Sequence, residues 1–395
     1  MSEWREVSLG SLLKLITKGT TPPKGKGFVE HGINYIKSDA INYNGRIDVT
    51  KFVAIDKETH HKFKRSQLEE LDILFSMAGA YLGKNGIVLK YMLPANTNQA
   101  LAILRVNQDL ALPYYISQFL GQSSMVDYIN NMSGQSAQPN INFQEISSIE
   151  INLPPLPEQK AIAEVLSSLD DKIDLLHRQN KTLEQMVETL FRQWFVEEAG
   201  EDWGEGVFGD FVVVKRGGSP RPIQEYLSDT GLRWLKISDA TKTSSPFLFD
   251  IKEHIKIEGL KKTTLLKSGK LVLSNSATPG IPKILQVDSC IHDGWLHFPK
   301  SYFSNEFLYL LFKKIRPELL MQGNGSIFTN LKTDILKEYP IKVPCKNSLD
   351  GFDEQVKPVF IKLLKSSKQI RTLESLRDTL LPKLMSGEVR IASNG

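Results

Sequence analysis

The densest group of potentially reactive side chains consists of Cys290, His292, Asp293 and His297. Cysteine, histidine and aspartate are zinc ligands, and a cysteine beside a histidine is the pattern of an activated nucleophile. The spacing argues against both kinds of site, because the step from His292 to His297 matches no standard zinc motif. We expect His292 and Asp293 to lie in a loop and to hold no metal.

Other catalytic patterns are missing from the sequence. There is no Gly-x4-Gly-Lys-Ser/Thr phosphate loop and no Asn-Pro-Pro-Tyr or Asp-Pro-Pro-Tyr tetrapeptide of an adenine methyltransferase. Pro154 and Pro155 stand between two leucines, which is typical of a segment leading into a helix. Asp170 and Asp171 fall within a helical pattern, and we expect them on its solvated face. A chain without catalysis is therefore favoured over a self-sufficient nuclease or methyltransferase.

Two loops combine cations with glycine and hydroxyl residues. The first reads Gly-Thr-Thr-Pro at positions 19–22 and the second reads Gly-Gly-Ser-Pro at positions 217–220. Proteins contact phosphate with such groups, although a basic loop can also be plain solvated surface. The candidate contacts are Lys18, Thr20, Lys24, Lys26, Lys37 and Lys84 in the first half of the chain, and Lys215, Arg216, Ser219, Arg221, Lys236 and Lys283 in the second.

Length and composition limit the elements that can position these loops. The 395 residues, 41% apolar and 24% charged, predict two or three globular domains. Two cysteines exclude a disulfide framework and indicate a reducing compartment. No signal peptide follows Met1, and no apolar run approaches the ~20 residues that span a bilayer. We expect a cytoplasmic protein whose net charge of +4 is compatible with a polyanionic partner.

The chain contains a tandem repeat of about half its length. At an offset of 199, Trp4 meets Trp203, Gly19 meets Gly218, and the segment 32–37 meets 231–236. Later matches keep their order at offsets between 190 and 197, ending at 379–380. A period of this length is too long for a solenoid, so each unit is a complete domain with an attached element.

The pattern of residues along each unit predicts an α+β fold with a mixed, mostly β core. Short β-like runs punctuated by glycine, proline and asparagine come first, as in 32–39 and 270–274. A helical stretch follows at 113–130 and at 305–320, and then a last strand-like run at 149–153 and 339–343.

A long heptad helix follows each domain. Residues 158–195 contain no glycine or proline, and apolar residues recur at alternating steps of four and three. Pro358 and Pro382 are expected to make the second helix shorter or kinked. The expected core and partner-docking positions are Leu166, Leu169, Ile173, Leu176, Asn180, Leu183 and Leu190, and then Leu363, Ile370, Leu373 and Leu380. Asn180 either fixes the register or faces a solvated cleft.

Two such helices separated by a domain are expected to pair as an antiparallel coiled coil with pseudo-two-fold symmetry. The first would span roughly 57 Å at 1.5 Å per residue and hold two similar heads apart. Duplex DNA suits such an arrangement. Candidate base readers lie in loops that the repeat superposes but fills differently, namely Tyr81, Asn98, Gln138 and His292. A coiled-coil scaffold presenting two similar protein-binding domains is the alternative.

Two segments resemble a known family. The run at 153–159, Leu-Pro-Pro-Leu-Pro-Glu-Gln, with its continuation Ala-Ile-Ala-Glu-Val-Leu at 161–166, resembles the central region of specificity subunits of type I restriction–modification enzymes. The C-terminal run at 380–389 does so as well, and the order domain, helix, domain, helix covers the whole chain. The second helix departs from the pattern, because no Pro-Pro-Leu-Pro run precedes it.

The resemblance implies two target recognition domains, at 1–155 and 199–345, each reading one half of a bipartite asymmetric DNA site. The helices at 156–198 and 346–392 would set the spacer and dock two methyltransferase subunits. These partners would use S-adenosylmethionine, and through them translocase–nuclease subunits would bring ATP and Mg²⁺. No cofactor is expected on this chain itself.

Overall fold

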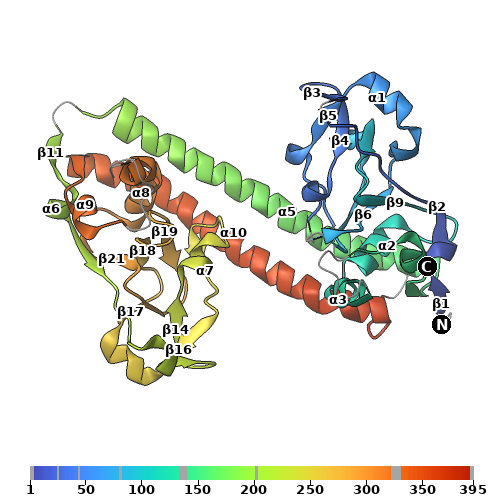
Figure 1. Ribbon diagram of the computed structural model, residues 1–395. Helices are drawn as coiled ribbons and strands as arrows, with labels where there is room; N and C mark the ends of the chain where they lie inside the picture. The colour runs from blue at the N-terminus through green and yellow to red at the C-terminus, as the bar shows by residue number, and fades with distance from the viewer. Residues whose placement is uncertain are drawn as a thin grey trace. The chain divides into compact units, whose positions relative to one another are not determined.

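The computed structural model describes residues 4–24, 26–42, 45–79, 82–132, 140–200, 203–321 and 331–391. The chain forms two compact units, and each unit contains a part of both long helices. Unit 1 contains Met1–Asp174 and Thr372–Gly395, and unit 2 contains Leu175–Arg371. The predicted α+β class is confirmed, since each repeat supplies a mostly β domain followed by a long helix (Figure 1). We call residues 4–155 head 1 and residues 203–345 head 2.

Head 1 is built from three small sheets. A first pair joins β1 and β10, a second sheet has the order β2-β9-β6-β7, and a third has the order β3-β5-β4-β8. The strands are β1 (Arg5–Ser8), β2 (Leu13–Lys18), β3 (Phe28–Val29), β4 (Ile33–Ile36), β5 (Val53–Ile55), β6 (Ile73–Ser76), β7 (Asn85–Ile87), β8 (Ala95–Thr97), β9 (Leu101–Val106) and β10 (Glu150–Leu153). Its helices are α1 (Lys57–Lys62), α2 (Pro113–Leu120), α3 (Ser123–Met132) and α4 (Phe143–Ser147).

Head 2 repeats this plan with larger sheets. It contains the pair β11-β22, a sheet of order β12-β21-β18-β19-β15 and a sheet of order β13-β16-β14-β20-β17. The strands are β11 (Gly204–Val207), β12 (Val212–Arg216), β13 (Leu227–Ser228), β14 (Leu232–Leu235), β15 (Phe247–Leu248), β16 (Glu253–Ile255), β17 (Thr264–Leu266), β18 (Leu271–Ser274), β19 (Pro282–Leu285), β20 (Ser289–Ile291), β21 (Trp295–Ser301) and β22 (Pro340–Val343). Its helices are α6 (Phe208–Phe211), α7 (Ile237–Thr241), α8 (Asn305–Met321) and α9 (Thr333–Lys337).

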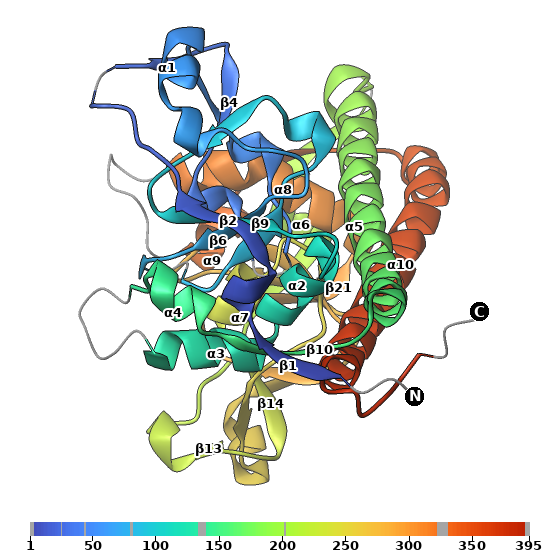
Figure 2. The same cartoon turned by 90° about the vertical axis from the view of Figure 1, so that its right-hand side faces the viewer.

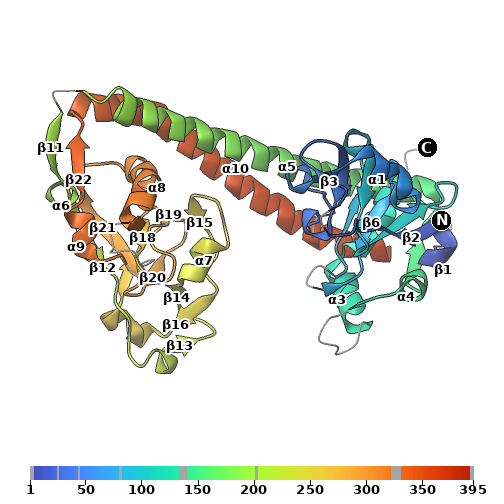
Figure 3. The ribbon, with the colours of Figure 1, turned by 45° about the horizontal axis from the view of Figure 1, so that its top comes forward.

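The core of each head lies at its central strands. Every residue of β6 in head 1 and of β18 in head 2 is buried, as expected for a strand covered on both faces. Apolar side chains of α2 belong to the core cluster of head 1, and those of α8 belong to the corresponding cluster of head 2. The first predicted helical stretch is in fact two helices, α2 and α3 (Figure 1), while the second is the single helix α8 (Figure 3).

The two long helices are α5 (Leu156–Arg192) and α10 (Lys346–Ser386). Of the two effects expected of the prolines, a shorter second helix is not observed: α10 has 41 residues, and α5 has 37 before it continues as a π-helical segment of 5 residues at Gln193–Glu197. Pro358 and Pro382 both lie inside it. The helix nevertheless stays continuous, as the heptad pattern predicted. Buried apolar contacts outweigh the hydrogen bonds that proline removes.

Within each unit, a part of α5 packs against a part of α10 (Figure 2). In unit 1, Ile162 and Leu166 share a core cluster with Leu384 and Met385. In unit 2, Val187 and Phe191 share one with Phe352 and Val356. Of the predicted seam residues, Leu166, Ile173, Leu176, Leu363 and Ile370 are buried, while Leu169, Asn180, Leu183, Leu190, Leu373 and Leu380 are partly buried.

Asp170 corrects one sequence expectation. Its side chain is buried rather than solvated: Oδ1 lies 3.2 Å from an Arg377 guanidinium nitrogen of α10, and Oδ2 accepts a hydrogen bond of 2.9 Å from Gln118. The exposed neighbour Asp171 pairs with Arg46 of head 1. The pattern of a single helix cannot show that a facing helix supplies an arginine to pair with a buried carboxylate.

Candidate nucleic-acid interface

The basic loop of head 2 is held tightly against the connection between β20 and β21. The Gly217 N–H donates to the Trp295 carbonyl at 2.9 Å, and the Gly218 N–H donates to the Ile291 carbonyl at 3.2 Å. A Cβ on Gly217 would lie 2.4 Å from the His292 carbonyl oxygen. Only glycine permits this close approach of two backbones.

Asp293 organises the cations of this loop. Its carboxylate accepts hydrogen bonds from the Ser219 hydroxyl at 2.7 Å and from Arg221 at 3.2 Å. Its backbone carbonyl accepts two more from the Arg216 guanidinium, at 2.8 and 3.1 Å. The hydrogen bond from Ser219 is the main cause that lowers the pKa of the Asp293 carboxyl below its ordinary value. Three residues predicted from the sequence, Arg216, Ser219 and Arg221, are thus brought together around one aspartate.

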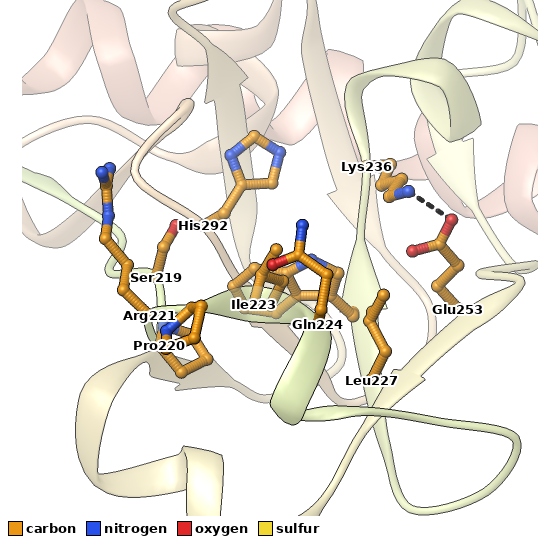
Figure 4. A pocket seen from close by; sticks show the side chains of 11 residues that line it. Ser219, Pro220, Arg221, Ile223, Gln224, Leu227, Lys236, Glu253 and His292 are labelled. Atoms are coloured by element: carbon orange, nitrogen blue, oxygen red, sulfur yellow. Dashed lines mark hydrogen bonds and ion pairs between the residues drawn. The ribbon is translucent and has the colours of Figure 1, made fainter.

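A pocket of about 690 Å³ opens beside this loop (Figure 4). Apolar side chains such as Ile223 and Leu227 lie along one side of it, and the polar groups of His292, Lys236 and Glu253 lie around the rest. Its lining residues are Ser219, Pro220, Arg221, Pro222, Ile223, Gln224, Leu227, Trp234, Lys236, Glu253 and His292. An apolar cleft with a few convergent polar groups is the usual form of a recognition site.

His292 lies in the loop after β20, as the sequence predicted, and its ring is fixed. Its Nδ1 accepts a hydrogen bond of 2.8 Å from the Gly294 N–H, and its ring lies 5.8 Å from that of Trp234. Burial lowers the pKa of His292, and the nearby charge of Lys236 lowers it further against the opposing effect of Asp293. At neutral pH the ring is therefore uncharged and carries its proton on Nε2.

The charge of Lys236 is compensated inside the pocket. Its ammonium forms an ion pair with Glu253 Oε1, whose partner oxygen Oε2 is buried without a hydrogen bond in the part of the chain that the structure describes. Lys236 is thus less available to an external anion than its charge suggested, because Glu253 competes for it.

Head 1 carries an equivalent loop with different side chains. The Gly19 N–H donates to the Leu101 carbonyl at 3.1 Å, and a Cβ on Gly19 would lie 2.1 Å from the Asn98 carbonyl oxygen. Gly19 therefore corresponds to Gly217, one position away from the Gly218 that the sequence offset paired with it. Asn98 corresponds to His292 in the same way.

The cations of the head 1 loop are accessible to a ligand. Lys18, Lys24 and Lys26 are exposed and form no ion pair with another described residue. The Tyr35 hydroxyl donates to the Thr20 carbonyl at 2.9 Å and ties the loop to β4. Lys37 lies over the Phe28 ring, 5.4 Å from its centroid. Free cations on a fixed loop are suited to phosphate contact.

The structure does not bring every predicted residue to these loops. Lys283 is 3% exposed, and its ammonium donates to the backbone carbonyls of Thr243 and Ser245. Burial lowers the pKa of Lys84, which is half-buried and makes an interaction of its own. Lys215 is exposed at the end of β12. Tyr81 and Gln138 lie outside the described residues.

Burial of Lys283 predicts a pH-dependent stability. Burial lowers the pKa of this lysine from 10.5 to about 8 although Glu184 of α5 opposes the shift. Between these values the unfolded chain binds a proton that the folded chain does not, so stability rises with pH across this window. Below pH 8 both states are protonated and this contribution is constant. Relative to Lys283→Met, we expect the free energy of unfolding of the wild type to gain up to about 3 kcal/mol between pH 8 and pH 10.5.

Chemical denaturation of both proteins at matched pH values measures this difference. Tyrosines and other lysines titrate in both proteins alike, so only the difference between the two curves reports Lys283. Parallel curves from pH 7.5 to pH 10.5 would contradict the assignment.

Sequence reasoning missed several residues that line the pocket or organise it. Asp293 was placed in the loop without a role, and Trp234, Gln224 and Glu253 were not singled out. The repeat held one usable signal, since it aligns Trp234 with the buried Tyr35. No sequence pattern pointed to Glu253, because it reaches Lys236 across neighbouring strands.

Neither a metal centre nor a membrane span emerges from the described part of the chain. No group of three or more histidine, cysteine, aspartate or glutamate side chains there is arranged to hold a metal ion. Cys290 and His297 are buried in strands β20 and β21, on either side of the loop that carries His292. None of the described helices has the length and hydropathy needed to cross a bilayer.

Comparison with known proteins assigns the repeat to one family. A family model described as the type I restriction modification DNA specificity domain matches residues 1–185 and again residues 200–357. The MjaIX specificity subunit of Methanocaldococcus jannaschii is 26% identical to this chain, in an alignment that covers 75% of this chain and 74% of that protein. The HindI specificity subunit of Haemophilus influenzae is 20% identical, covering 98% and 100%. The crystal structure of an S subunit from M. genitalium shares the fold, with a TM-score of 0.64, 16% identity, and coverage of 97% of this chain and 96% of that one.

Proposed function

The chain belongs to the family of type I restriction–modification DNA specificity subunits, and from this premise we propose that its two heads read the two halves of one bipartite, asymmetric DNA target. A phosphate-contacting loop in each head would position it on the duplex, and side chains of the adjoining connection would read base edges. The observation that carries the proposal is the equivalence of the two loops. In each head, a glycine of the basic loop packs against the backbone of the connection that follows the parallel strand pair. At the equivalent position of this connection, head 1 has Asn98 and head 2 has His292.

Similar backbones with different side chains suit two different half-sites. Identical heads would read a symmetric target, whereas heads that differ at the base-facing positions read an asymmetric one. The cations Lys18, Lys24 and Lys26 in head 1, and Lys215 and Arg221 in head 2, supply the sequence-independent part of the affinity.

The paired helices would set the distance between the half-sites and dock the partner subunits. Both α5 and α10 carry large apolar side chains that are exposed, including Met186 on α5 and Ile361 on α10. Exposed apolar groups on a rigid helix are suited to a protein interface. The partners would be two methyltransferase subunits that use S-adenosylmethionine and, through them, ATP-dependent translocase–nuclease subunits. This chain would select the site without performing chemistry.

Methylome sequencing tests this function directly. In cells that express the chain with its methyltransferase partner, we expect N6-methyladenine within a single two-part motif with a fixed spacer. Deleting the chain should abolish methylation of that motif, and re-expression should restore it. Methylation that persists unchanged after the deletion would exclude the proposed function. Salt-independent association of the complex with DNA would favour a protein-binding scaffold instead, since phosphate contacts impose a steep salt dependence.

A further inference from the structure

The residue that follows the parallel strand pair occupies the same place in both heads. In head 1, Thr97 of β8 pairs with Ile36 of β4, and Asn98 comes next. In head 2, Ile291 of β20 pairs with Leu235 of β14, and His292 comes next. The carbonyl of each residue faces the anchoring glycine of its basic loop. The backbones of the two residues therefore lie against the loop that we assign to phosphate contact.

His292 offers a hydrogen-bond donor and no acceptor. Its Nδ1 accepts a hydrogen bond from the Gly294 N–H, and its ring lines the pocket beside the loop (Figure 4). Among the described residues, Nε2 has no hydrogen-bond partner. In the major groove a single donor matches guanine N7 or O6, adenine N7 and thymine O4, and it cannot bond the N4 amino group of cytosine.

Asn98 offers both a donor and an acceptor. Its Oδ1 is buried and lacks a donor in the part of the chain that the structure describes, and its amide nitrogen makes no hydrogen bond to a described residue. An unpaired buried amide oxygen is costly, so a rotation of the Asn98 side chain that turns this oxygen toward a donor on a ligand is favoured. Adenine presents the matching pair, an N6 amino donor beside the N7 acceptor.

We propose that positions 98 and 292 are the equivalent base-reading positions of the two heads, with Asn98 contacting an adenine and His292 contacting a base that presents an acceptor. The inference rests on the proposed function and adds to it the residues and the base chemistry that make the target asymmetric. The shared backbone gives both heads the same approach to DNA, and the exchanged side chain gives each head its own preference.

The test compares the methylated motifs of His292→Ala and Asn98→Asp with that of the wild-type complex. Loss of the His292 donor should relax one base position in one half of the motif, changing the base preference there on the order of 10- to 100-fold. Asn98→Asp removes the amide donors and leaves only acceptors, so the preference at one position of the other half should shift from adenine toward cytosine. Each variant is the control for the other, because each should leave the opposite half unchanged.

His292→Gln separates reading from folding, since it keeps an amide donor in the pocket. If His292→Ala abolishes methylation altogether, His292→Gln should restore it at a motif that differs at one position of one half at most. Motifs unchanged in both His292→Ala and Asn98→Asp, changes spread over both halves, or complete loss in every variant would overturn the proposal. The proposed function fails separately, if the wild-type complex itself methylates no two-part motif.

Discussion

Replacing Lys18, Lys24 and Lys26 by glutamine is expected to lower the affinity of the assembled complex for DNA roughly 100-fold at 0.15 M salt. All three side chains are exposed, flank the glycine-anchored loop of head 1 and have no ion-pair partner in the described part of the chain. Each phosphate contact releases condensed counterions, which contributes about 0.9 to the slope of log K against log salt concentration. The slope should therefore become shallower by about 2.7.

Binding titrations between 50 and 300 mM salt, with the target duplex and with a scrambled duplex of equal length, measure the slope. Both duplexes should lose affinity by the same factor, because phosphate contacts carry no base information. The control replaces Lys90, Lys160 and Lys172, three exposed lysines on other elements of unit 1. An equal loss in the control, or an unchanged slope in the loop variant, would refute the placement of DNA on this loop.

Phe352→Ala is expected to destabilise the protein by about 3–5 kcal/mol. The Phe352 ring is fully buried in unit 2, and its centroid lies 4.7 Å from that of Phe195, 5.9 Å from that of Phe191 and 6.0 Å from that of Trp194. This aromatic cluster joins the end of α5 and the π-helical segment Gln193–Glu197 that follows it to the first turns of α10, so the substitution leaves a cavity where the two helices meet the head.

Urea unfolding followed by tryptophan fluorescence measures the loss, and Trp194 places a reporter in the cluster itself. Ile361→Ala is the matched control, because this α10 side chain is 67% exposed and should change stability by no more than about 0.5 kcal/mol. A loss below 1 kcal/mol in Phe352→Ala would show that the cluster does not hold the helices to the head.

The positions of secondary structure were largely predictable because their signals are local. The last strand of each head, β10 and β22, lies where the strand-like runs predicted it, and α8 differs from its predicted range by one residue at its C-terminal end. The long helices follow from a seven-residue repeat of apolar side chains, which is a property of one segment. The prolines of α10 misled because a local rule for proline ignores the burial that α10 gains.

The candidate site was predictable only in part. Its cations, glycines and hydroxyls were recognised by residue type, and the repeat indicated that they occur twice. Their partners were not: Asp293 lies 74 positions from Ser219, and Glu253 lies 17 positions from Lys236. Lys283 was grouped with the loop by charge alone, although the fold buries it beneath the carbonyls of Thr243 and Ser245.

The sequence by itself determined that the protein is a duplication of one domain and one helix, and that each copy carries a basic, glycine-containing loop. Repeats and heptads are patterns in the order of residues along the chain, so they can be recognised without the tertiary structure. Only the tertiary structure decided that Gly19 matches Gly217, that Asp170 faces Arg377, and that Asn98 and His292 occupy one position. These facts depend on which distant segments meet, because burial and pairing are set by the packing of strands and helices that no local pattern specifies.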